Sequence, residues 1–400
     1  MDTNMHVPLL DLKKQLEPIR EEIVEAVSEV IDSTNYILGP KVEGLEKDVA
    51  AYSGSRHGIG VASGTDALLA ALMGLKVGPG DYVLTTPYSF FATMGSVLRL
   101  GAKPLFADID PVTYNIDPAQ VAEILANHPY REKIKVILPV HLYGQCVDMP
   151  RILSLAEQYG IPVLEDAAQA IGAACPFIED GKRVWKKAGA MGRAGCFSFF
   201  PSKNLGGIGD GGMIVTSDDQ LAEDLRIIRV HGGAPKYYHG VIGGNFRLDT
   251  VQAVVLSVKL PHLPDWHNAR RRNADRYNRL FEESGLVDKG MIMLPKAVYR
   301  ADAGDEPDGP DYHIYNQYVI RSVDRDRLIQ FLQKHDIGVE IYYPVPLHKQ
   351  TCLAAMGYNE LSYPESEMAA AETMALPIYP ELTAEMQEYV VSQVVAFFRQ

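Results

Sequence analysis

Short apolar segments alternate with helical patterns in the first half of the chain, and this alternation constrains the fold more than any other feature. Buried strands are predicted at residues 82–85, 104–107, 136–140 and 162–165. Helices are predicted around them at residues 67–75, 118–126 and 149–159. Strands that alternate with helices form a mostly parallel sheet covered on both faces. Because ligands of such sheets bind at the carboxyl ends of the strands, we expect a site there.

Lys203 lies between a short aromatic strand and a run of glycines. Most lysines are solvent-exposed, and Lys203 taken alone would be interpreted in that way. The glycines after it allow a close approach of the backbone to a ligand; they are Gly206, Gly207, Gly209, Gly211 and Gly212. They form a close-approach loop and do not open a helix, as the glycines of a G-x-G-x-x-G dinucleotide fingerprint do, so that fingerprint is rejected. A lysine in such a loop can form a Schiff base with an aldehyde cofactor such as pyridoxal phosphate.

An acidic motif, Glu165-Asp166-Ala167-Ala168-Gln169, follows one of the predicted strands. Its small residues leave room for a flat ring at the strand end. Asp166 could pair with a protonated pyridine nitrogen, which keeps the ring able to accept electrons. Gln169 could hydrogen-bond the phenolic oxygen of the same ring. Alternatively, Asp166 starts a loop or caps a helix.

The segment Ser63-Gly64-Thr65-Asp66 predicts the start of a helix. Ser63 can be the N-cap, with Asp66 in the capping-box position. The free backbone N–H groups and the helix dipole suit a phosphate, Gly64 permits close approach, and Thr65 adds a hydroxyl. The alternative is a capped helix without a ligand.

Two more side chains could contact a planar cofactor. Phe90 could stack on its ring, and offset stacking contributes about 0.5–1.5 kcal/mol beyond burial. The aromatic cluster around Phe90 could equally belong to the core. Ser198 could bond a phosphate, or it could simply be a polar residue of the strand predicted at residues 196–200.

The composition excludes several classes of function. The net charge of −13 argues against a nucleic-acid-binding surface. No apolar segment reaches the roughly 20 residues of a membrane helix, and residues 1–8 lack the features of a secretory signal. The cysteines Cys146, Cys175, Cys196 and Cys352 form no C-x-x-C pair. This pattern indicates reduced thiols, a cytoplasmic protein and no metal site.

The second half of the chain predicts a smaller domain. Pro261 and Pro264 end a predicted helix at residues 250–260, and a long helix is predicted at residues 266–284. We therefore predict a large domain at residues 1–260 and a small α+β domain at residues 261–400. Its elements are predicted at residues 315–320, 325–334 and 339–343.

Taken together, these segments resemble the DegT/DnrJ/EryC1/StrS family of pyridoxal-phosphate-dependent sugar aminotransferases. The resemblance extends over nearly the whole chain, from the segment starting at Val7 to the segment ending at Tyr379. It rests on the order and spacing of Ser63-Gly64-Thr65-Asp66-Ala67, Asp166-Ala167-Ala168-Gln169, Ser198-Phe199-Phe200-Pro201-Ser202-Lys203-Asn204, Gly244-Asn245-Phe246-Arg247-Leu248-Asp249 and Tyr343-Pro344-Val345-Pro346-Leu347-His348.

The resemblance implies an aspartate-aminotransferase type of fold and a homodimer with active sites shared between subunits. It implies that Lys203 is the Schiff-base lysine, and that Asp166 and Gln169 bind the ring nitrogen and the phenolic oxygen. Phe90 would stack on the ring. The phosphate would be held by Gly64, Thr65 and Ser198, and by Asn245 from the neighbouring subunit. The sugar pocket would include His231, Arg247, Tyr343 and His348.

The implied reaction moves an amino group from L-glutamate to a nucleotide-linked ketosugar in two half-reactions. L-Glutamate leaves as 2-oxoglutarate, the cofactor becomes pyridoxamine phosphate, and Lys203 acts as the general base. The aminosugar product would serve surface polysaccharide or glycan biosynthesis, such as that of a lipopolysaccharide O-antigen.

The substrate stays open, because the ketone could lie at C3 or C4 and the nucleotide could be UDP or dTDP. The tract Lys236-Tyr237-Tyr238-His239 resembles the branch of the family that acts on a UDP-linked 3-keto sugar, such as a 2-acetamido-2-deoxy-hexuluronate, and the resemblance favours that substrate. The alternative is C4 amination of a UDP- or dTDP-4-keto-6-deoxy sugar. Sugar dehydratases of this fold carry histidine at the position of Lys203, which argues against that activity. A regulatory relative would need a DNA-binding segment or a lost lysine, and neither is seen.

Two segments depart from the family pattern. Residues 175–191 are longer and more basic than the usual linker, and they form either a nucleotide contact or a surface hairpin, of which the hairpin is favoured. Residues 301–310 form an additional acidic loop that is predicted to be solvated.

Overall fold

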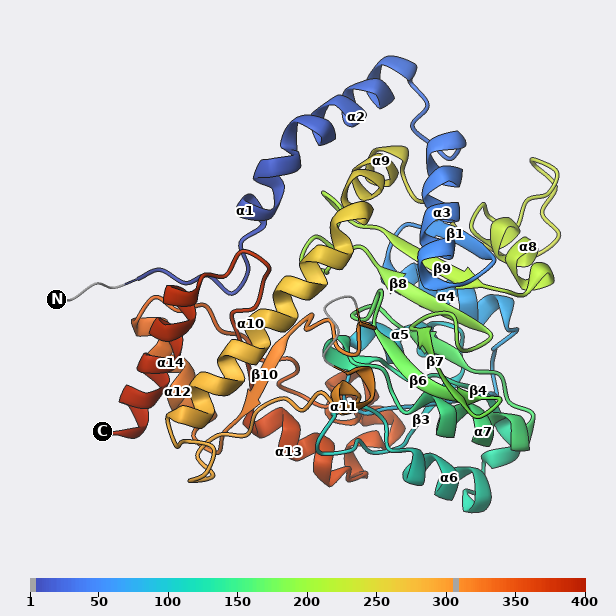
Figure 1. Ribbon diagram of the computed structural model, residues 1–400. Coiled ribbons are helices and arrows are strands. Elements are labelled where there is room, and N and C mark those ends of the chain that lie inside the picture. Colours follow the sequence, from blue (N-terminus) through green and yellow to red (C-terminus); the bar gives the residue numbers. More distant parts are fainter. Residues whose placement is uncertain (1–4, 305–308) are drawn as a thin grey trace.

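The computed structural model of the chain describes residues 5–304 and 309–400. Its central sheet has the strand order β3-β2-β4-β5-β8-β9-β1 (Figure 1). The strands are β1 (His57–Val61), β2 (Tyr82–Thr85), β3 (Lys103–Phe106), β4 (Ile134–Ile137), β5 (Leu164–Asp166), β8 (Ala194–Ser198) and β9 (Gly212–Thr216). Neighbouring strands pair in parallel, except where β9 pairs with β8 and β1. The prediction of a mostly parallel sheet is therefore confirmed.

Helices cover both faces of this sheet, and neighbouring strand residues point to opposite faces and belong to different cores. Leu84 belongs to the core under α3 (Pro40–Ser53), α6 (Pro118–Asn127), α7 (Met149–Tyr159) and α9 (Thr250–Lys259). Val83, the preceding residue, belongs to the core under α4 (Gly64–Gly74), α5 (Phe91–Arg99) and α8 (Asp219–Ile228). This arrangement leaves the carboxyl ends of the parallel strands free to form a site.

The long helix α10 (Leu263–Glu283) leads from this sheet to a smaller C-terminal core (Figure 1). That core packs around the antiparallel strands β10 (Tyr318–Arg321) and β11 (Thr373–Leu376), with α12 (Arg325–Lys334) and α14 (Ala384–Phe398). Helix α13 (Pro364–Glu372) leads into β11. Val7 is buried in this core and pairs with Ile337, so the start of the chain contacts the C-terminal part. The division at residue 260 stays a prediction.

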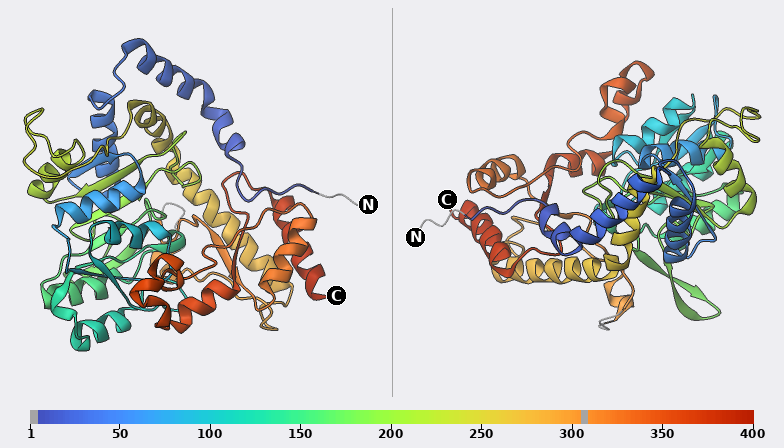
Figure 2. Two further views of the ribbon diagram at one scale, coloured as in Figure 1. Left: turned by 180° about the vertical axis from the view of Figure 1, so that it is seen from behind. Right: turned by 90° about the horizontal axis from the view of Figure 1, so that it is seen from above.

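The remaining elements are short, apart from one N-terminal arm. This arm comprises α1 (Leu12–Leu16), η1 (Glu17–Ile19) and α2 (Arg20–Ser33), and it projects from the body in Figure 2. The other short elements are η2 (Arg131–Lys133), η3 (Leu142–Gly144), η4 (Leu260–His262), α11 (Arg300–Ala303), η5 (Leu347–Lys349), η6 (Thr351–Met356) and η7 (Tyr358–Glu360). Among the described residues, no helix is both long and apolar enough to span a membrane.

The basic insertion at residues 175–191 forms a hairpin of β6 (Ala174–Glu179) and β7 (Lys182–Lys187), as favoured from the sequence. Its Arg183 pairs with Asp302 at 2.7 Å, which connects the hairpin to the start of the acidic loop. Residues 305–308 of that loop lie outside the described residues.

The element predicted at residues 339–343 is neither a regular helix nor a regular strand in the structure. Only Glu340 pairs there, in a single bridge with Ala375 of β11. Pro344 and Pro346 follow directly, and proline cannot donate to a strand ladder. The segment therefore crosses β11 at one point instead of extending the sheet.

Candidate active site

A cavity of about 480 Å³ opens at the carboxyl ends of the parallel strands. The predicted residues that line it are Gly64, Thr65, Phe90, Asp166, Gln169, Ser198, Lys203 and Tyr343. They come from segments far apart in sequence. Apart from Tyr343, each lies in a segment that ends or follows a strand of the central sheet, so the sheet brings these segments together. The cavity is where the alternating pattern predicted a ligand site.

Asp166 ends β5 and is 4% exposed. Its Oδ2 accepts a hydrogen bond from the Thr93 hydroxyl at 2.8 Å, and its Oδ1 accepts one from the Ala168 N–H at 3.2 Å. Burial raises the pKa of the Asp166 carboxyl, while these hydrogen bonds and the Lys203 charge act in the opposite direction. The carboxylate is thus held in one orientation and would gain from a cationic partner.

Lys203 follows β8, and its backbone N–H donates to the Phe200 carbonyl at 2.8 Å. Burial lowers the pKa of its amine to about 8, and the nearby Asp166 carboxylate opposes this shift. Within the described part of the chain, no side chain hydrogen-bonds to the Lys203 amine. A lysine with a lowered pKa and a free amine is suited to react with a carbonyl carbon.

The start of α4 forms a cradle for an anion. The Ser63 hydroxyl accepts from the Asp66 N–H at 3.0 Å, which confirms the predicted N-cap. Gly64 packs against the end of β8 so closely that an added Cβ would lie 2.6 Å from the Ser198 Cβ. The N-terminal N–H groups of the helix therefore lie beside the Ser198 and Thr65 hydroxyls at the cavity wall, a combination that suits phosphate.

Gln169 has its amide orientation fixed by two hydrogen bonds. Its Oε1 accepts from the Tyr143 N–H at 2.7 Å, and its Nε2 donates to the Tyr343 hydroxyl at 3.0 Å. Burial raises the pKa of the Tyr343 phenol, with the Asp166 charge acting in the same direction. Tyr343 is therefore a neutral phenol, and Gln169 can present a second N–H to the cavity.

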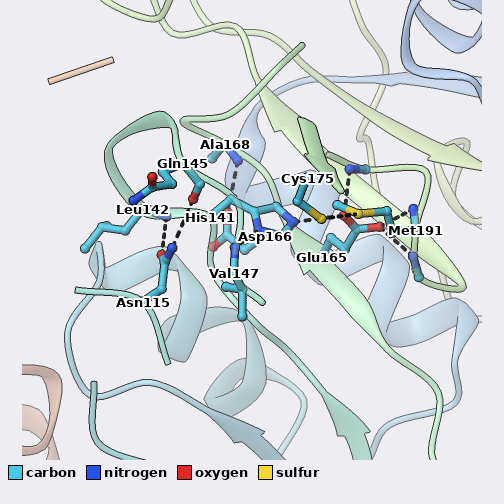
Figure 3. Close-up of polar contacts among 12 residues, drawn as sticks. Asn115, His141, Leu142, Gln145, Val147, Glu165, Asp166, Ala168, Cys175 and Met191 are labelled. Atoms are coloured by element: carbon cyan, nitrogen blue, oxygen red, sulfur yellow. Dashed lines mark hydrogen bonds and ion pairs between the residues drawn. The ribbon is translucent and has the colours of Figure 1, made fainter. Parts of the chain in front are cut away.

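Behind Asp166 lies a buried pair, Glu165 and His141, whose Nε2 and Oε2 atoms are 2.9 Å apart (Figure 3). The Val147 N–H donates to His141 Nδ1, so Nε2 carries the proton and donates to Glu165. Glu165 also accepts from the backbone N–H groups of Gly189, Met191 and Gly192. The backbone N–H of His141 donates to the Asp166 carbonyl at 3.0 Å, so the pair fixes the backbone that carries Asp166.

Sequence reasoning assigned no role to Thr93, Glu165 or His141. Glu165 stands inside the predicted acidic motif, and Thr93 stands close to Phe90. Their hydrogen-bond partners are distant in the chain, because His141 is 24 positions from Glu165 and Asp166 is 73 positions from Thr93. A strongly polar residue at the end of an apolar strand was the available signal for Glu165.

Four predicted residues do not line the cavity within this chain. Asn245 is exposed and pairs with Val230, and Arg247 pairs with Val61 beside β1. His231 begins the loop at residues 231–245 and accepts the His239 ring N–H at its carbonyl. His348 is fully buried, with its Nε2 2.9 Å from Glu367. Their roles in binding phosphate or sugar stay predictions.

The cavity residues fit pyridoxal phosphate. The cradle at Gly64 suits its phosphate, the buried Asp166 carboxylate suits its ring nitrogen, and the Lys203 amine suits its aldehyde. A mostly parallel α/β sheet with this lysine and aspartate at its carboxyl edge defines the class of type I pyridoxal-phosphate-dependent transferases.

The chain belongs to the DegT/DnrJ/EryC1/StrS aminotransferase family, whose model matches residues 17–395. It is 50% identical to a pleiotropic regulatory protein of Geobacillus stearothermophilus, over 99% of both chains. It is 40% identical to the UDP-N-acetyl-3-dehydro-alpha-D-glucosamine 3-aminotransferase of Acidithiobacillus ferrooxidans, over 96% of both chains.

Solved structures show the same fold. The crystal structure of DesV from S. venezuelae has a TM-score of 0.86 and 37% identity, over 99% of both chains. NtdA from Bacillus subtilis, solved with bound pyridoxamine phosphate, has a TM-score of 0.85 and 31% identity, over 99% of this chain and 86% of NtdA. The aspartate-aminotransferase type of fold and the family predicted from the sequence are confirmed.

Proposed function

We propose that the protein transfers an amino group from L-glutamate to a nucleotide-linked ketosugar, with pyridoxal phosphate as cofactor. The observation that carries this proposal is the free Lys203 amine in one cavity with the buried Asp166 carboxylate. The family relation supports it, because the Acidithiobacillus relative is named as a nucleotide-sugar aminotransferase.

The cofactor would be held by the residues that surround the cavity. Gly64, Thr65 and Ser198 would bind its phosphate, Asp166 its ring nitrogen and Gln169 its phenolic oxygen. Phe90 would cover one face of the ring. When bound, pyridoxal phosphate supplies an electrophilic carbon and an electron-accepting ring.

Lys203 would move the proton that each half-reaction requires. Its pKa of about 8 leaves a useful fraction of neutral amine near neutral pH, and a neutral amine can take a proton from the α-carbon of the donor. Asp166 would keep a cationic partner in place throughout, because its carboxylate is fixed by Thr93 and Ala168.

For the acceptor we propose a UDP-linked 3-keto sugar, with a 2-acetamido-2-deoxy-hexuluronate as the candidate. The name of the Acidithiobacillus relative supports C3 amination of a UDP sugar. The tract Lys236-Tyr237-Tyr238-His239 supports the uronate, and Arg247 could pair with its carboxylate. C4 amination of a UDP- or dTDP-4-keto-6-deoxy sugar is the alternative that the same assay tests.

A regulatory function is the second candidate, because a relative at 50% identity is named as a pleiotropic regulatory protein. A regulator would bind a ligand in this cavity without converting it, so it would show no turnover that depends on the Lys203 amine. Measurement of turnover therefore separates the two functions.

We also propose a homodimer in which each cavity is completed by the second copy. Support comes from apolar side chains exposed near the cavity mouth, where Phe90 is 57% and Phe200 is 52% exposed. Exposed apolar patches of this kind mark interfaces. Asn245 and Arg247, which do not line the cavity of their own chain, would then reach the cavity of the partner.

The experiment begins with the protein loaded with pyridoxal phosphate. L-Glutamate should change the cofactor absorbance and release 2-oxoglutarate, and one member of a panel of UDP- and dTDP-ketosugars should restore the absorbance. Lys203→Ala should lose both steps. Lys187→Ala, at a partly buried lysine on the hairpin, is the matched control and should keep them. Near wild-type turnover by Lys203→Ala would refute the proposal.

The shared site is tested with two inactive variants. Lys203→Ala and Asn245→Ala should each lose turnover alone. Mixed dimers would contain one cavity with both residues intact, so mixing should restore part of the activity. No restoration in samples shown to exchange subunits would refute the shared site.

A further inference from the structure

A second cavity, of about 100 Å³, lies next to the active-site cavity. Ser202, Gln317 and Tyr342 line both cavities, so the two cavities adjoin at these residues. The far wall of the second cavity includes Arg270 of α10 and Ala375 of β11. The second cavity thus lies on the small-domain side of the Lys203 loop.

Arg270 places a buried cation at this wall. Its side chain is 2% exposed, and its Nη1 donates to the carbonyls of Tyr315 and Ile378, each at 2.9 Å. Within the described residues it forms no ion pair. Burial lowers the pKa of Arg270 to about 10, so the guanidinium stays charged at neutral pH.

The carboxylate that acts on this charge from within the chain is Glu381, which lies beyond ion-pair distance. Burial raises the pKa of Glu381, and the Arg270 charge acts in the opposite direction. Glu381 Oε2 is buried without a hydrogen-bond partner, so this carboxylate is itself poorly placed to neutralise the arginine. A buried cation without a close counter-ion favours the binding of an anion.

The amide of Gln317 adds a second polar group between the cavities. Its Oε1 is buried and has no hydrogen-bond partner. A terminal amide can turn to direct either its oxygen or its N–H groups toward a ligand. Gln317 can therefore donate to an anion that Arg270 attracts.

The charged side chains of the larger cavity do not suit the carboxylates of a dicarboxylic amino donor. Such a donor therefore needs a cation like Arg270 from outside that cavity. Of the described residues that line it, the charged ones are Asp166, Asp210 and Lys203. Lys203 is assigned to the reacting carbon, and the two aspartates repel anions. A dicarboxylic amino donor must find its counter-ion outside this wall, or from a second copy of the chain.

We propose that the second cavity binds one carboxylate of the amino donor, with Arg270 as its counter-ion and Gln317 as a hydrogen-bond donor. This inference rests on the proposed function, because it places the donor nitrogen at Lys203. Lys203 and Ser202 are adjacent in the chain, so the donor would extend past Ser202 into the smaller cavity. A volume of about 100 Å³ accommodates a carboxylate.

The first measurement uses glutarate and butyrate as unreactive probes of the cofactor-loaded protein. Glutarate should raise the melting temperature more than butyrate does, and Arg270→Gln should abolish this difference. Arg270→Gln should also raise the KM for L-glutamate at least 30-fold with a smaller change in kcat. A cavity that holds water alone would show no glutarate effect in the wild type, and this outcome would overturn the inference.

The matched control is Arg325→Gln. Arg325 is also buried, and its Nη1 donates to the carbonyls of Ala370 and Thr373, but it lines neither cavity. Loss of glutarate binding in both arginine variants would show a general structural effect and would count against a carboxylate site.

A second variant keeps the charge and fills the space, in case Arg270→Gln does not fold. Ala375→Val adds two methyl groups at the wall of the smaller cavity and should raise the KM for L-glutamate as well. This inference alone is refuted if the wild type releases 2-oxoglutarate from L-glutamate and both variants have the same KM for L-glutamate as the wild type. If the wild type releases none, the proposed function fails, and this inference fails with it.

Discussion

Thr93→Val removes the hydroxyl that holds the Asp166 carboxylate, and it keeps nearly the same side-chain volume. Thr93 is fully buried in α5, and its Oγ1 donates to Asp166 Oδ2 at 2.8 Å. The same Oγ1 lies 2.8 Å from the Ser89 hydroxyl, so its hydrogen-bond geometry is set from two sides. The substitution therefore tests one contact of the carboxylate that we assign to the cofactor ring.

The expected magnitude follows from this geometry. A hydrogen bond to a charged group contributes about 1.5–3 kcal/mol. One pKa unit corresponds to about 1.4 kcal/mol, so the pKa of Asp166 should rise by about one to two units. Burial already raises this pKa, and the loss of Thr93 adds to that shift. A protonated carboxyl cannot pair with a cation, so cofactor binding weakens when Asp166 becomes protonated. The pH below which the cofactor binds weakly should therefore rise by the same number of pH units as the pKa of Asp166.

The assay is a titration of the cofactor-free protein with pyridoxal phosphate, followed by absorbance across a pH series. Thr93→Val should weaken the Kd at least about tenfold at pH 7, and Thr93→Ser should restore it. Ser53→Ala is the control, because Ser53 is a buried hydroxyl of α3 that donates to the Val49 carbonyl and does not line the cavity. A Kd and pH profile for Thr93→Val equal to those of Ser53→Ala would refute the reasoning.

Two further predictions concern the cradle and the lysine. Gly64→Ala should weaken cofactor binding about tenfold or more, because its Cβ would lie 2.6 Å from the Ser198 Cβ, whereas Gly44→Ala in α3 meets no atom within 4 Å and should leave the Kd unchanged. In the cofactor-free protein, acetylation of Lys203 by acetic anhydride, followed by peptide mass spectrometry, should rise through a midpoint near pH 8. Because this folded pKa lies below the unfolded value of 10.5, Lys203 destabilises the cofactor-free fold below about pH 8, and this effect fades as the pH rises toward 10.5. A midpoint for Lys203 equal to that of exposed lysines would contradict the burial described here.

Local sequence patterns predicted much of the sheet, because its strands are short apolar segments bounded by polar or glycine residues. The range predicted for β2, residues 82–85, equals the observed strand, and α7 and α12 also begin and end where expected. Periodicity is decisive for such elements, because each has a face buried against a core. The same argument explains why Lys203 and Asp166 could be found, since Asp166 ends an apolar strand and Lys203 lies in the loop that follows another.

Contacts between distant segments could not be predicted in this way. Strand β1 holds two glycines, and β11 is a short run of small and apolar residues, so neither has a strong local signal. The N-terminal helix α2 carries apolar residues at helical spacing, but few of them are buried, so its local pattern does not predict where the helix lies on the body. The bonds from Thr93 to Asp166 and from His141 to Glu165 exist only because the sheet brings three separate segments together.

The positions of Asn245 and Arg247 bear on whether one chain is sufficient for the reaction. Asn245 ends the loop at residues 231–245 and Arg247 follows it, and the Ala62 N–H donates to the Phe246 carbonyl between them. This segment is therefore fixed directly beside the strand that leads into the phosphate cradle of its own chain. Asn245 is nevertheless exposed, and neither residue lines the cavity. A rearrangement large enough to turn them inward would break the pairing of Arg247 with Val61. We therefore expect their side chains to act on a second copy, which requires no such rearrangement.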